Sequence, residues 1–205
     1  MEDKAKIKDI IKFLDNIFTK LVGKIKEFEV VNSQLLPFGF KPHTRSISWI
    51  AEQVILQQAK IKRKELGIKD ITFSKRDIDV FDCIITDNLD RKIYVNVKVT
   101  NIEGRHNKND ISAAERLYNF LINSDELGVF YVVLGIKFEN TKVKFITDQI
   151  FTFNPICLPD IYVNPKNAKL QAYYDAKAVE RTKKEFLDLL YKASQKKKIK
   201  FPKRH

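Results

Sequence analysis

Cysteine and histidine are scarce in this sequence. The 205 residues include 2 Cys and 3 His, and Cys83 and Cys157 have no spacing typical of zinc ligands. Both lie in apolar stretches, so we expect small buried side chains of a protein from a reducing cytoplasm. The scattered histidines form no catalytic dyad, and the sequence contains neither G-x-S-x-G nor a P-loop. These absences argue against zinc modules, hydrolases with a G-x-S-x-G nucleophile and P-loop enzymes.

Long apolar runs are also missing. No stretch approaches the roughly 18 apolar residues that a membrane span needs. Residues 1–8 are charged and lead into an amphipathic pattern, which is unlike the apolar segment of a signal peptide. We therefore expect a soluble, cytoplasmic protein.

Acidic residues are outnumbered by basic ones. The chain has 38 Lys and Arg against 26 Asp and Glu, for a net charge of +12, and its 44% hydrophobic content excludes wholesale disorder. The excess favours an anionic partner, most simply nucleic acid, although lysine-rich proteins that bind no polyanion also exist. The basic tail 196–205 is either a solvated end or a phosphate-binding arm.

The length predicts one domain with additions at both ends. Helices are predicted over 4–30, 44–66, 112–123 and 172–194, and strands over 69–73, 128–136 and 142–150, with a loop-rich segment at 151–169. Ser112 and Glu115 form a capping-box pattern at the start of the third helix. The wide apolar stripe of the first helix either docks on its own domain or forms a subunit interface.

The stretch from Arg76 to Asn101 predicts a β-hairpin, because two alternating β-branched segments flank a polar turn. On its second strand, Asn96 and Lys98 share one face, since side chains alternate with period 2. The first strand carries Asp79 and Asp82 on opposite faces.

The register of the hairpin decides which acid meets Asn96. If Thr86 pairs with Lys92, Asp82 lies opposite Asn96, with Cβ atoms about 5 Å apart. A slip of one residue would bring an apolar side chain there instead. In the favoured register an acid, an amide and a lysine converge, which predicts either a satisfied polar patch or a functional site.

The order helix, three strands, helix, strand resembles the core of the PD-(D/E)XK nucleases, and Val95-Asn96-Val97-Lys98-Val99-Thr100 is similar to the D-I-K-T-T-type strand of type II restriction endonucleases, particularly the EcoRV-like branch. The resemblance covers about residues 44–136. It implies an α/β (α+β) fold with a mixed central sheet flanked by helices. The expected division is an N-terminal helix and loop at 1–43, a catalytic core at 44–150, and a C-terminal loop, helix and tail at 151–205.

The resemblance also implies roles for particular residues. Asp82 takes the place of the first acid, Asn96 of the second and Lys98 of the lysine. Glu52 matches an acid of the first core helix, although a helical Glu can equally be solvated or a capping residue. Asp82, the Asn96 oxygen and the Val97 carbonyl would hold Mg²⁺, which prefers oxygen ligands, but Asn96 stands where an acid is expected and lowers the negative charge by one.

These residues lead to a primary expectation and two alternatives. The first is a Mg²⁺-dependent restriction endonuclease that cuts double-stranded DNA at a specific site, as a homodimer. The others are a junction resolvase or repair nuclease with the same core, and a catalytically weak DNA-binding module, which Asn96 favours. The polar loop after the hairpin either contacts DNA or is solvated; its candidate residues are Arg105, Asn107, Lys108 and Asn109.

Overall fold

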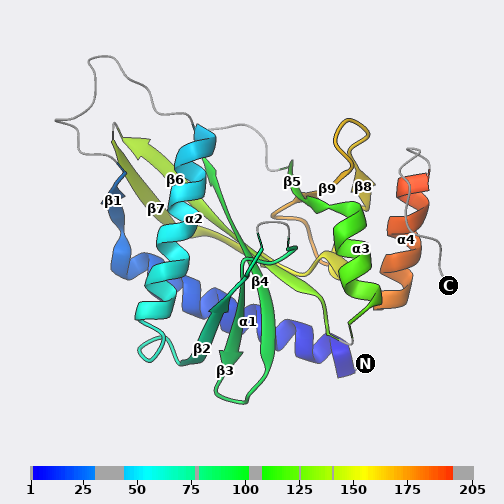
Figure 1. Cartoon of the computed structure of the whole chain (residues 1–205), viewed down its shortest axis with the longest axis horizontal. Coiled ribbons are helices and arrows are strands. Elements are labelled where there is room, and N and C mark those ends of the chain that lie inside the picture. The colour runs from blue at the N-terminus through cyan, green and yellow to red at the C-terminus, as the bar shows by residue number, and fades with distance from the viewer. Residues whose placement is uncertain are drawn as a thin grey trace.

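A computed structural model describes residues 2–30, 44–76, 79–101, 108–124, 126–139 and 141–195 (Figure 1). The helices are α1 (Glu2–Ile25), α2 (Thr44–Ile61), α3 (Ala114–Ile122) and α4 (Lys183–Gln195), with a short 3₁₀ turn, η2 (Pro155–Cys157). The strands are β1 (Glu27–Glu29), β2 (Ile68–Phe73), β3 (Cys83–Asp87), β4 (Lys92–Asn101), β5 (Lys108–Ala113), β6 (Val129–Glu139), β7 (Lys142–Phe153), β8 (Tyr162–Val163) and β9 (Lys169–Tyr173). None of the described helices is long and apolar enough to cross a bilayer.

The main sheet has six strands in the order β1-β7-β6-β4-β3-β2. β4 and β6 are parallel, and the other neighbouring pairs are antiparallel. A parallel pair needs a crossover between its strands, and the chain between β4 and β6 contains β5 and α3. The predicted fold class, a mixed sheet flanked by helices, is confirmed.

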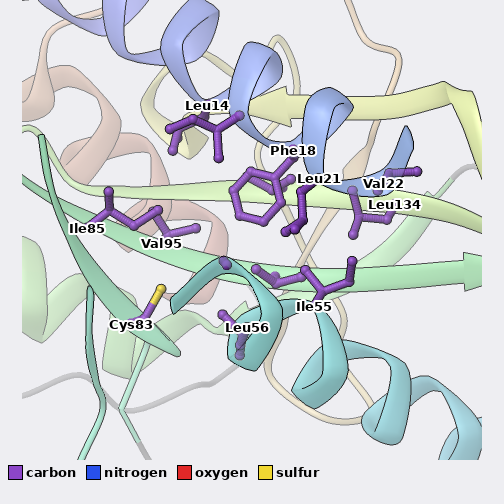
Figure 2. Close-up of a cluster of buried hydrophobic side chains, with 14 of the residues drawn as sticks. Leu14, Phe18, Leu21, Val22, Ile55, Leu56, Cys83, Ile85, Val95 and Leu134 are labelled. Atoms are coloured by element: carbon purple, nitrogen blue, oxygen red, sulfur yellow. The ribbon is translucent and has the colours of Figure 1, made fainter. Parts of the chain in front are cut away.

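One face of this sheet is covered by α1 and α2. Leu14 and Phe18 of α1 are completely buried, and they pack with Ile55 of α2 over Ile85 and Val95 of the sheet (Figure 2). Burying each such side chain stabilises the fold by about 1.5–3 kcal/mol. Of the two interpretations of the apolar stripe of α1, the structure therefore has the helix docked on its own domain.

On the other face, α3 lies beside a second sheet of order β5-β9-β8, and α4 packs against α3 and β8 (Figure 1). This sheet corrects the prediction of a loop-rich segment followed by a helix from Ala172. Residues Leu170 and Ala172 are buried on β9, and α4 begins only at Lys183. Thr182 precedes it, and the backbone N–H of Thr182 donates to Glu185 while the Glu185 N–H donates to the Thr182 hydroxyl, which is a reciprocal capping box.

The capping box predicted at Ser112 is wrong. Ser112 lies in β5, where it pairs with Leu170, and α3 starts after Ala113 without a side-chain cap. The physical reason is strand pairing. Residues 108–113 are extended because they pair with β9, so the helix begins at Ala114, two residues after Ser112.

The predicted hairpin register is confirmed. Thr86 pairs with Lys92 and Cys83 with Val95, so the next residue back, Asp82, lies beside Asn96. The first strand is shorter than predicted, because the chain is irregular before Cys83. Asp79 falls in that irregular part, where Ser74 and Arg76 bind its carboxylate, so it takes no part in the cluster around Asn96.

Candidate active site at the edge of β4

The candidate site lies where β3 begins and the second half of β4 becomes a sheet edge. In the described part of the chain no strand pairs with β4 on this side beyond Val95. Two carboxylates bind the backbone donors that have no strand partner there. The N–H of Val97 donates to Asp82 Oδ2 at 2.7 Å, and the N–H of Val99 donates to Glu52 Oε1 at 3.2 Å. The two acids therefore come to adjacent outward-facing N–H groups of one strand.

Glu52 reaches this edge because of how α2 packs. Ile47, Ala51, Ile55 and Ala59 form the buried stripe of the helix, and Glu52 lies on its flank. It is neither a solvated residue nor a helix cap, since its carboxylate is directed at β4 and it lies well inside α2.

Asn96 is 6% exposed and is bound through its nitrogen. Nδ2 donates to the Val80 carbonyl at 3.2 Å and makes a long contact of 3.5 Å with Asp82 Oδ1. Both partners are acceptors, so the opposite orientation of the amide would place its one oxygen against two acceptor oxygens. Asn96 Oδ1 is buried and has no hydrogen-bond partner among the described residues.

The site is electrostatically coupled. Burial raises the pKa of Asp82, and the positive charge of Lys98 and the Val97 N–H partly offset the shift. Burial also raises the pKa of Glu52, while Lys98 and the Val99 N–H lower it and the charge of Asp82 raises it further. The Lys98 side chain is half-buried. One ammonium group thus interacts with both acids.

The potential metal ligands at this edge are all oxygens. The N–H and C=O of one residue in an extended strand point to the same side, so the Val97 carbonyl faces the same edge as the N–H that binds Asp82. Two carboxylates and a carbonyl suit a hard divalent cation. Within the described residues no three His, Cys, Asp or Glu side chains gather as metal ligands, so a cation here would need neutral oxygens in addition to Glu52 and Asp82.

The predicted DNA-binding loop is mostly outside the described residues. Arg105 and Asn107 lie there, as does the side chain of Lys108, whose backbone begins β5. Asn109 follows on β5, opposite Ala172 of β9. Burial raises the pKa of the neighbouring Tyr174 hydroxyl, and a hydrogen bond with Asn109 partly offsets this. Asn109 therefore lies in the second sheet, where β5 pairs with β9.

Sequence reasoning missed Tyr131. It lies on β6 next to Asn96 in the parallel register, and it is completely buried. Burial raises the pKa of its hydroxyl, and the charge of Asp82 adds to the shift. No sequence signal could have found it, because the register between β4 and β6 depends on a crossover rather than on a local turn.

Comparison with known proteins gives the fold. No family model matches the sequence, and no curated protein matches it. Among solved structures, the chain is similar to the NlaIV restriction endonuclease, with a TM-score of 0.56 and 14% sequence identity over 86% of this chain and 77% of that chain. This protein therefore has a restriction-endonuclease-like fold.

Proposed function

We propose that this protein is a Mg²⁺-dependent endonuclease of the PD-(D/E)XK type, in the EcoRV-like branch, that hydrolyses phosphodiester bonds of double-stranded DNA at a specific site. The observation that carries the proposal is the meeting of Glu52, Asp82 and Lys98 at the open edge of β4. The similarity to a restriction endonuclease supports it, and the net charge of +12 agrees with a polyanionic substrate.

The metal would be held by Asp82, Glu52 and the Val97 carbonyl. When bound, Mg²⁺ would polarise a phosphoryl oxygen and lower the pKa of a coordinated water. Asn96 has a different role in this proposal from the one expected of its oxygen: through Nδ2 it holds the Val80–Asp82 segment against β4. Glu52 then supplies the second carboxylate.

Lys98 would act on the phosphate. Its positive charge already favours the ionised forms of both Asp82 and Glu52. A phosphodiester bound at this edge would bring an anion to the same group, and the charge that grows in the transition state would be stabilised there. In this proposal Lys98 therefore has the role of an electrostatic catalyst.

The test is cleavage of supercoiled plasmid DNA with Mg²⁺ and with EDTA. We expect Lys98→Ala to lower the cleavage rate by about 10²- to 10³-fold with DNA binding nearly unchanged. Lys92→Ala is the matched control, because Lys92 lies on the same strand but is exposed at its far end. Cleavage that persists in EDTA, or a Lys98→Ala protein as fast as the Lys92→Ala protein, would overturn the proposal.

A catalytically weak DNA-binding module is the second candidate, because Asn96 leaves the site one negative charge short of the expected pattern. Binding of plasmid without Mg²⁺-dependent cleavage would support it. A resolvase or repair enzyme would prefer four-way junctions or damaged duplexes, whereas a restriction enzyme gives discrete bands from intact plasmid.

Cutting both strands of a palindromic site requires two active sites, so we also propose a two-fold homodimer.

A further inference from the structure

The chain has 1 tryptophan, Trp49, and its side chain is 62% exposed on α2. An indole buries a large apolar area when it finds a partner. Trp49 has no such partner in the described protein, although the residues around it on α2 include the buried Ile47 and Ala51.

The position of Trp49 follows from the stripe of α2 to which it belongs. Residues three and four apart lie above one another on a helix, so Trp49, Glu52, Leu56 and Lys60 form one stripe. Lys60 donates to the carbonyl of Ile71 on β2 at 2.7 Å, and Leu56 is buried in the core. Glu52 reaches the N–H of Val99.

The stripe therefore passes from the covered part of the sheet to its open edge. Ile71 pairs through Ile85 with Ile93, near the start of β4, whereas Val99 lies near its end. Trp49 is one further turn along the helix, or about 5 Å beyond Glu52. Trp49 therefore lies beyond the part of β4 that pairs with β3, next to the candidate site.

We propose that Trp49 is a substrate-binding residue that packs against the nucleotide next to the scissile phosphate. This inference rests on the proposed function. Lys98 and the metal would bind the phosphate but offer nothing to the apolar face of the sugar. An exposed indole one turn from Glu52 supplies an apolar surface for the sugar, which stays accessible in a duplex whose stacked bases cover one another.

The experiment uses the single tryptophan as its own reporter. The full chain in EDTA is titrated with a mixed-sequence 30-base-pair duplex, and binding is followed by anisotropy of a labelled duplex and by tryptophan emission with the unlabelled duplex. We expect emission to change with the same midpoint as anisotropy. Trp49→Ala should weaken binding about 2- to 10-fold, and Trp49→Phe less.

Ile61→Ala is the matched control, because Ile61 is 67% exposed at the other end of the same helix; it should bind like the wild type. Circular dichroism checks that each variant is folded. Binding with unchanged emission, or a Trp49→Ala protein with wild-type affinity, would overturn the inference about Trp49 and leave the proposed function standing. An emission change that depends on protein concentration without DNA would show a contact between copies of the chain and overturn it too. Absence of any anisotropy change would overturn the inference, because the indole contact is expected to form without a metal, and plasmid cleavage with Mg²⁺ would then decide the proposed function by itself.

Discussion

The Asn96 side chain shows how a single residue can order a site by donating hydrogen bonds. Its nitrogen contacts the Val80 carbonyl and the Asp82 carboxylate. An acid at this position would face two acceptors with a third negative charge and no proton to offer. In the metal-free protein, an amide at position 96 is therefore more stabilising than a carboxylate. A bound cation would favour the carboxylate instead.

Exchange of Asn96 for aspartate tests this reasoning. We expect Asn96→Asp to reduce the free energy of unfolding by about 1–3 kcal/mol in EDTA, because a buried hydrogen bond is replaced by repulsion. Mg²⁺ should recover part of that loss by binding the added carboxylate. Urea unfolding with and without Mg²⁺ measures both effects. Equal stability of the two proteins in EDTA would show that the amide does not organise the site.

Burial of the two acids gives a pH prediction. The folded-state pKa values of Asp82 and Glu52 are raised, so the folded protein holds these protons more tightly than the unfolded chain. Burying the two ionised carboxylates destabilises the fold. This destabilisation is fully present above the raised pKa values, falls as the pH drops through them, and vanishes below the pKa values of the unfolded chain, near 4.

Asp82→Asn should therefore raise the melting temperature at pH 7.5 in EDTA by about 2–4 °C, or roughly 1 kcal/mol, and the gain should shrink towards pH 4. The exposed Asp148 provides the control, since Asp148→Asn should have little effect at either pH. Thermal unfolding followed by circular dichroism measures this. A gain that grows at acidic pH would contradict the sign of the shifts.

At the scale of elements, α1 is part of the core. Phe18 is completely buried against the sheet, so Phe18→Ala should reduce the free energy of unfolding by about 3–5 kcal/mol. The neighbouring Thr19 is exposed, and Thr19→Ala should change it by less than about 0.5 kcal/mol. Urea unfolding and size-exclusion chromatography measure the outcome. A change in oligomeric mass without loss of stability would instead assign the helix to an interface.

The elements that sequence reasoning predicted well are those fixed locally. The hairpin register follows from a short turn and period-2 alternation, and it placed Asp82 beside Asn96 as the structure does. The second sheet was missed because β5 and β9 are about 60 residues apart in the chain, and no local pattern marks such a pairing. The same non-local pairing overrode the helix signal at Ser112.

The site was partly predictable for the same reason. Asp82, Asn96 and Lys98 belong to one hairpin, so their meeting depended only on its register. The carboxylate of Glu52 comes from another element, and only the packing of α2 brings it to Val99. The orientation of the Asn96 amide could not be predicted, because it depends on the carbonyl of Val80 in an irregular segment.

At the scale of the whole molecule, the charge of +12 predicts how the proposed binding to DNA should depend on salt. If basic side chains neutralise about 6–10 phosphates, the affinity should fall by about 10³- to 10⁵-fold between 50 and 200 mM salt. Anisotropy of a labelled 30-base-pair duplex at several salt concentrations measures the slope. A loss smaller than tenfold would show that the excess positive charge serves another purpose.

The open edge of β4 has a consequence for the behaviour of the protein in solution. Unpaired backbone donors at a strand edge invite another chain to add as a strand. Here the carboxylates of Asp82 and Glu52 occupy those donors, so we expect the groups proposed for catalysis to oppose strand addition at this edge as well. Removing both as alanine would uncover two adjacent donors and favour edge-to-edge assembly, whereas glutamine and asparagine would keep an acceptor in each place.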